Sequence, residues 1–185
     1  MARVIIILLL FFPKCIHCQN SIDTAILKKE FTVIFERDQK CRKGDSVQFR
    51  TYIDSTNLVR VKAIVEKYGW LGKSEIGNRG NYTIWLVVQH ADLKTQEKYL
   101  PLMKASVEKG ESRPVDLAYL EDRVLMRQGK NQIYGTQISM NPKTGAQELW
   151  PIEDEKNVNA RRSKLELEPM EEYAKHFGID YKLPK

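Results

Sequence analysis

The segment Tyr82 to Val88 is the strongest constraint on the fold, because it is apolar on every side. An element without a polar face must be covered by other elements all round, so this segment belongs at the centre of the molecule. Its β-branched residues would suit a strand, but its length and context favour a helix. The sequence therefore predicts a central helix around which the rest of the chain packs.

Amphipathic helices are predicted on both sides of this segment. Between residues 23 and 42, Leu27, Phe31 and Ile34 have the spacing of one helix face, and the same stripe continues to Asp38 and Arg42. Buried charges need partners, so we expect these two side chains to be paired. Further helices are expected at 57–68, at 93–109 with a kink at Pro101, from Pro114 onward, at 159–165 and at 169–177, with a glycine-spaced loop at 69–80.

After Gly129 the pattern changes to that of a β-hairpin. Residues 132–140 are expected to form one strand, 141–145 the turn and 148–152 the returning strand. On such a strand Gln132, Tyr134 and Thr136 share one face, and Gly135 indicates either a bulge or the close approach of a ligand. The amide and hydroxyl groups favour a strand that is a binding wall. The predicted fold class is mainly α (α+β): a compact helical domain with one small β-hairpin at about residues 132–152.

The first residues have the order of a secretory signal: Arg3, then the apolar run Val4 to Phe12, then a short polar stretch. We expect a signal peptide at 1–18, cleaved after Cys18, followed by a single globular domain at 19–185. Lipidation of a cysteine is the weaker alternative. The run is too short to span a membrane, and no later segment is long enough. The expected location is the periplasm or the exterior of the cell.

Loss of residues 1–18 would leave Cys41 as the only cysteine, with His90 and His176 as the only histidines. A lone cysteine forms no internal disulfide, and a Cys/His zinc site would need more ligands. We expect no metal and no cofactor. The formal charge of +6 is scattered, so nucleic-acid binding is not expected either. Arg161 and Arg162 are interpreted as solvated surface.

Three residues are the catalytic candidates: His90, Asp92 and Asp122. His90 follows the buried central segment, and imidazole is the side chain best suited to proton transfer near neutral pH. The alternative is a hydrogen-bonded core histidine. Asp92 or Asp122 would orient the imidazole, although Asp92 also suits the N-cap of the following helix.

Substrate binding is assigned to polar residues at the ends of apolar elements. Arg123 would bind a carboxylate or a phosphate through its two-pronged guanidinium, or else form a structural ion pair with Asp38 or Asp92. Trp70 would either fill the core or line a pocket. The complete set of binding candidates is Gln89, Arg123, Tyr134, Gln137, Asp38, Arg42 and Trp70.

These residues occur in an ordered set of short motifs. The motifs are Asp38-Gln39 with Arg42, Tyr68-Gly69-Trp70, Gln89-His90-Ala91-Asp92, Ala118-Tyr119-Leu120 with Asp122-Arg123, and Tyr134-Gly135-Thr136-Gln137. From about residue 35 to 173 the chain resembles a bacterial family known only as a domain of unknown function. The resemblance marks the same polar residues and implies no established activity.

Two hypotheses follow. The first is an exported hydrolase-like or ligand-processing domain, in which His90 is the general base or acid and a small polar or anionic ligand is held by Arg123 and Gln137. The second is a non-enzymatic binding or protein-interaction module, in which the same residues form a structural network.

Overall fold

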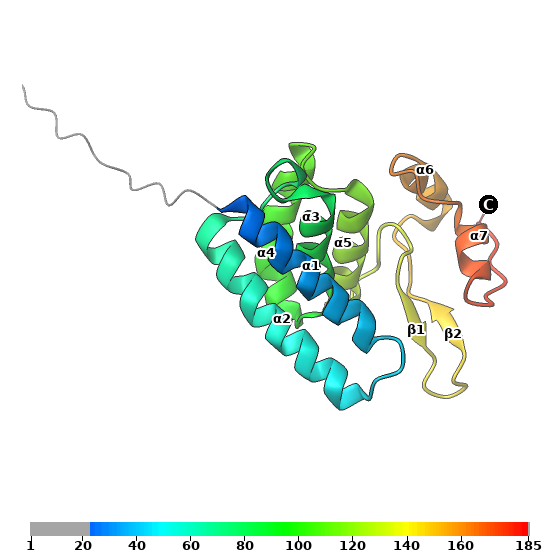
Figure 1. Cartoon of the computed structure of the whole chain (residues 1–185). Coiled ribbons are helices and arrows are strands. Elements are labelled where there is room, and N and C mark those ends of the chain that lie inside the picture. The colour runs from blue at the N-terminus through cyan, green and yellow to red at the C-terminus, as the bar shows by residue number, and fades with distance from the viewer. Residues whose placement is uncertain (1–22, 185) are drawn as a thin grey trace, which may run out of the picture.

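Helices make up most of the chain. The computed structural model describes residues 23–184 (Figure 1). In order, its elements are α1 (Thr24–Cys41), α2 (Val47–Tyr68), α3 (Lys73–His90), α4 (Leu93–Glu108), α5 (Pro114–Arg127), β1 (Ile138–Met140), β2 (Gln147–Leu149), the 3₁₀ turn η1 (Glu155–Asn157), α6 (Val158–Ser163) and α7 (Met170–Lys175). The expected mainly helical fold with one small hairpin is confirmed.

Helix α3 is the centre of the bundle, as predicted from its apolar sequence. It contacts α1, α2, α4 and α5, and every residue from Thr83 to Gln89 is buried. The predicted loop at 69–80 is too long, because α3 already begins at Lys73. Gly77 still interrupts the helix with a φ of 76°, which an L side chain would make strained.

Helix α2 begins at Val47, well before the predicted start at Asn57. Ser46 caps it by accepting a hydrogen bond from Phe49 N at 3.2 Å. The early turns were missed because their apolar side chains follow no buried stripe: Val47 is 63% exposed and Tyr52 60% exposed.

The C-terminal part has a second apolar cluster, formed by Ile152, Val158, Met170 and Tyr173. The hairpin pairs Ile138 with Leu149 in antiparallel register. In Figure 1 the hairpin, α6 and α7 lie together on one side of the helical bundle. None of the helices within residues 23–184 is long and apolar enough to cross a membrane.

The predicted strand at 132–140 is wrong over its first half. Only Ile138–Met140 is strand, and before it Gln132 makes a single parallel bridge to Ile152. Residues 133–137 form a loop, because the backbone N–H groups of Ile133, Tyr134 and Thr136 donate to the carboxylate of Asp122 rather than to a partner strand. There is consequently no polar strand face to serve as a binding wall.

Arg162 corrects the expectation that the arginine pair is solvated. Its side chain is 0% exposed and donates hydrogen bonds to Tyr134 O at 2.8 Å and Glu168 O at 2.6 Å. Tyr173 Oη also donates to Thr136 O at 2.8 Å. These contacts fasten the C-terminal helices to the 133–137 loop, which is itself bound to α5.

Candidate functional site

The first group of predicted site residues lies at the C-terminal ends of α1, α3 and α5. Here Asp38 of α1 and Arg42, the residue that follows α1, meet Asp54 of α2. One Arg42 nitrogen, Nη2, donates to Asp38 Oδ1 at 2.8 Å and to Asp54 Oδ1 at 2.6 Å. Asp38 is 1% exposed, so the predicted pairing of these buried groups is confirmed. We refer to Asp38, Arg42 and Asp54 as the carboxylate–arginine triad.

His90, the last residue of α3, is half-buried next to this triad. Burial lowers the pKa of its imidazole, and the positive charges of Arg42 and Arg123 lower it further, against the opposing charges of Asp38 and Asp54. The imidazole is therefore neutral near neutral pH. A neutral imidazole can accept a proton, which a general base must do.

Arg123 reaches the same helix end from α5. Its Nη1 donates to the Gln89 carbonyl at 3.5 Å, and Arg127 Nη1 donates to the Ala91 carbonyl at 2.5 Å. Both cations thus lie at the negative end of the α3 dipole. The expected ion pair of Arg123 with Asp38 or Asp92 is absent, and within residues 23–184 no carboxylate forms a salt bridge with Arg123.

The guanidinium of Arg123 is therefore a half-buried charge without a counter-ion in the described chain. Burial lowers the pKa of Arg123, and the neighbouring Arg127 lowers it further. Its Nε–H is buried and has no hydrogen-bond partner among the described residues. An anion from outside the chain would supply both the missing charge and the missing acceptor.

Asp122, one residue away, is held in a different environment. It is 0% exposed and accepts hydrogen bonds from the backbone nitrogens of Ile133 (2.7 Å), Tyr134 (3.1 Å) and Thr136 (3.0 Å), and from Thr136 Oγ1 at 2.9 Å. Burial raises the pKa of the carboxyl group, and these hydrogen bonds oppose the rise. The hydrogen-bond acceptor sites of the Asp122 carboxylate are thus used by the 133–137 loop.

The other predicted residues lie in structural positions. Asp92 is exposed and accepts from Thr95 N at 2.7 Å, which confirms its N-cap role. Gln137 Nε2 donates to Thr136 Oγ1 at 3.0 Å, inside the loop bound by Asp122. Tyr134 is half-buried in the same loop, and its carbonyl accepts from Arg162. Trp70 is half-buried: it packs against the bundle core, donates to Ser112 Oγ at 3.1 Å and also lines a cavity of about 210 Å³, so it combines the two expected positions.

Two residues near His90 were not predicted. Asp54 completes the triad, but it lay outside the expected helix. Gln96 is 0% exposed and donates from Nε2 to the Gln89 carbonyl at 2.7 Å. The available signal was an amide in the apolar stripe of α4, whose other buried members include Tyr99 and Met103.

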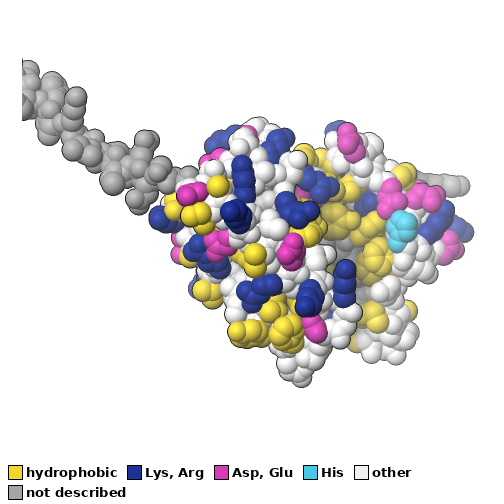
Figure 2. Space-filling model, in the orientation of Figure 1, with side chains coloured by type: hydrophobic (Ala, Val, Ile, Leu, Met, Phe, Trp, Pro, Cys, Tyr) yellow, Lys and Arg dark blue, Asp and Glu magenta, His cyan; other side chains and the backbone are white. Residues whose placement is uncertain are grey.

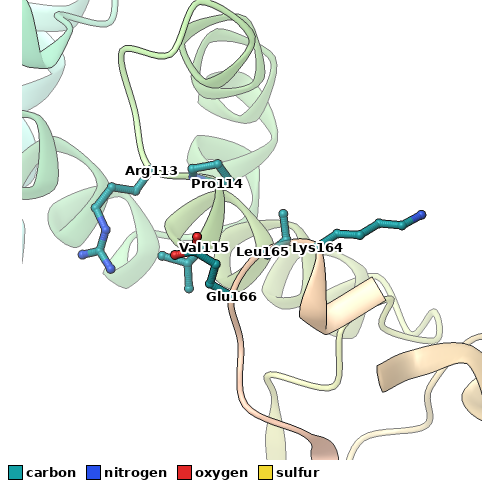
Figure 3. A pocket seen from close by; sticks show the side chains of 6 residues that line it. All are labelled: Arg113, Pro114, Val115, Lys164, Leu165 and Glu166. Atoms are coloured by element: carbon teal, nitrogen blue, oxygen red, sulfur yellow. The ribbon is translucent and has the colours of Figure 1, made fainter. Parts of the chain in front are cut away.

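A cavity of about 400 Å³ lies between the start of α5 and the segment after α6, lined by Arg113, Pro114, Val115, Lys164, Leu165 and Glu166 (Figure 3). None of the predicted site residues lines it. In Figure 3 the side chains of Arg113 and Lys164 point away from each other. In residues 23–184 no three His, Cys, Asp or Glu side chains are grouped to hold a metal ion.

The surface in Figure 2 carries basic and acidic side chains intermingled over the helical bundle, with a hollow between the bundle and the C-terminal part where hydrophobic side chains are visible.

Comparison with known proteins gives one match. Searches of the curated proteins and of the solved structures both find nothing that matches. A family model described as a family of unknown function, DUF6624, matches residues 27–184, nearly the whole of the described chain. The expected membership of a family of unknown function is thereby confirmed: the chain belongs to the DUF6624 family.

Proposed function

We propose that this chain is a hydrolase-like or ligand-processing domain, in which Arg123 binds an anionic substrate and His90 acts as general base. The observation that carries the proposal is the charge of Arg123, which is half-buried, lacks a carboxylate partner within residues 23–184, and acts on the neutral imidazole of His90. A cation and a neutral base side by side suit the attack of water on an anionic substrate.

The roles follow from what each group is free to do. The Arg42 guanidinium is shared by two carboxylates, so we assign it to positioning rather than to substrate binding. The negative charges of Asp38 and Asp54 would stabilise the imidazolium that forms when His90 takes a proton from water. Asp122, Gln137 and Tyr134 are assigned to holding the 133–137 loop in place.

The second candidate is a binding module without turnover. It is favoured by the hydrogen bonds of Asp122, since they take one of the three catalytic candidates out of reach of a substrate. In this case the site at Arg123 would still hold an anion, but His90 would only shape it.

Turnover and binding can be separated with matched variants. We would assay a panel of phosphate and carboxylate esters with the wild type, His90→Ala and Arg123→Gln. His176→Ala serves as control, because that histidine is exposed. The proposal expects hydrolysis that falls by about 10²-fold or more in His90→Ala and is unchanged in the control. Anion binding that requires Arg123, without turnover of any ester, would favour the binding module. Activity that survives His90→Ala would refute the role of the base.

Export is also proposed, from the charged, apolar and polar order of residues 1–18, which lie outside the described residues. Expression of the full chain in a bacterial host, followed by mass spectrometry of its N-terminus, tests this. A chain beginning at Gln19 in the periplasmic fraction would support it, and an unprocessed N-terminus in the cytoplasmic fraction would refute it.

A further inference from the structure

Two buried polar atoms beside the proposed site have no hydrogen-bond partner among residues 23–184. One is a donor, Arg123 Nε, and the other an acceptor, Gln96 Oε1. Gln96 is 0% exposed. Buried polar groups in folded proteins are almost always hydrogen-bonded, to protein, to water or to a ligand. A donor and an acceptor that both lack partners therefore need an explanation.

The side chains that carry these two atoms bind the same carbonyl. Gln96 Nε2 donates to Gln89 O at 2.7 Å, and Arg123 Nη1 donates to that oxygen at 3.5 Å. In each side chain the unpartnered atom and the bonded atom are attached to the same carbon. The free donor and the free acceptor thus belong to two side chains that converge on one carbonyl, that of the residue directly before His90.

A group that meets both atoms must accept one hydrogen bond and donate another. A hydroxyl oxygen does this, whereas an oxygen of a fully ionised oxyanion accepts only. Such an oxygen would satisfy Arg123 but would place one acceptor against another at Gln96, leaving the Gln96 oxygen unpaired and buried.

We propose that Gln96 selects anionic ligands that carry an O–H group, such as hydrogen phosphate or a hydroxy acid. In the complex, Arg123 Nε–H donates to the hydroxyl oxygen, and the hydroxyl proton is donated to Gln96 Oε1. This inference rests on the proposed binding of an anion at Arg123 and deepens it by naming the ligand class. No bond is made or broken in this recognition.

Inorganic phosphate and sulfate test the proposal with the wild-type protein alone. At mildly alkaline pH both are dianions of similar size, and phosphate alone carries a proton. Titration calorimetry of the full chain at constant ionic strength should give phosphate a dissociation constant about tenfold to a hundredfold lower than that of sulfate, since sulfate leaves the Gln96 oxygen unpaired.

The variant Gln96→Met tests whether Gln96 causes the preference for phosphate over sulfate, because methionine keeps the length of the side chain and removes the acceptor. Phosphate should then lose its advantage and bind about as weakly as sulfate. Ser106→Ala is the matched control: it removes another buried polar group from α4 and should leave the ratio of the two constants unchanged. If Gln96→Met does not fold, the wild-type ratio still decides.

The binding of phosphate and sulfate distinguishes a failure of the selectivity from a failure of the anion site. Equal binding of phosphate and sulfate, lost for both in Arg123→Gln, would overturn the selectivity and leave the anion site standing. The same would follow if Gln96→Met kept the wild-type preference, since a buried water would then account for the two atoms. If neither anion binds the wild type, both proposals are overturned.

Discussion

The imidazole of His90 owes its neutral state to its burial at the end of α3 and to the positive charges of Arg42 and Arg123. Burial is the largest cause of its low pKa, followed by the charge of Arg42. We predict a pKa for His90 below its ordinary 6.5 in an NMR titration of the folded protein. Arg123→Gln removes one repelling charge and should raise this pKa. A value at or above 6.5 in the wild type would contradict the described environment.

Asp122 gives a second prediction, because its carboxylate is saturated by the 133–137 loop. Replacing it with asparagine puts an amide donor where the backbone nitrogens need an acceptor, inside a site that water does not reach. Unpaired buried groups of this kind cost about 2–4 kcal/mol in the free energy of unfolding. Urea denaturation of Asp122→Asn measures it.

Asp92→Ala is the control for that substitution. It removes only an exposed helix cap, so it should cost about 1 kcal/mol. An Asp122→Asn variant as stable as the wild type would mean that the carboxylate does not hold the loop, and would return Asp122 to the list of candidates for chemistry.

At the scale of elements, α6 and α7 are joined to the bundle through the loop rather than through a shared apolar core. Arg162 is the buried link, donating to Tyr134 O and Glu168 O, with its guanidinium 4.7 Å from the Tyr173 ring centroid. Arg162→Met should therefore cost about 3 kcal/mol and should increase amide hydrogen exchange in residues 132–137 more than in α3.

Arg161→Met controls for the loss of positive charge. Arg161 is more exposed and donates to the carbonyls of Ile133, Asp154 and Glu153, so its replacement removes the same charge and several backbone hydrogen bonds at a solvated position and should cost about 1–2 kcal/mol. If the two variants are equally stable, the buried position of Arg162 does not contribute to the attachment.

The sequence predicted an element correctly where the spacing of its apolar residues determines its structure. The central segment of α3, the N-cap at Asp92 and the start of a helix at Pro114 were predicted correctly, because apolar runs and N-terminal signals report directly on local structure. The 133–137 loop was mistaken for a strand. Its shape is set by Asp122, a long-range partner that alternation of polar and apolar residues does not reveal.

In the candidate site, too, some features can be predicted from the sequence and others depend on how the helices pack. A histidine that follows an apolar helix is visible in the sequence, and so is an arginine on the apolar face of α5. That Arg123 lacks a carboxylate while Arg42 has two depends on how α1, α2 and α5 pack, and no spacing rule contains that information. The two partners expected for Arg123 are engaged elsewhere: Asp38 binds Arg42, and Asp92 caps α4.

The free energy of unfolding of the whole molecule should depend on pH through one buried carboxyl group, that of Asp116. Asp116, in the first turn of α5, is 5% exposed, and burial raises its pKa from 3.8 to about 6, only partly opposed by Arg113 at 3.6 Å. The folded state thus holds this proton more tightly than the unfolded state does. Its contribution to stability is fully present below the ordinary pKa and is lost as the pH rises through about 6.

Asp116→Asn removes this titration and nearly preserves the side-chain volume. A pKa rise from 3.8 to about 6 corresponds to about 3 kcal/mol, so the variant should be more stable than the wild type by about 1–3 kcal/mol near neutral pH. The difference should vanish below the ordinary pKa, where the wild-type carboxyl is protonated in both states. His90 titrates equally in both proteins and cancels from the comparison. Urea denaturation across this pH range measures the difference, with Asp45→Asn as an exposed control. A stability difference that does not change with pH would show that Asp116 stays ionised, which would require an acceptable partner for its charge in the folded protein.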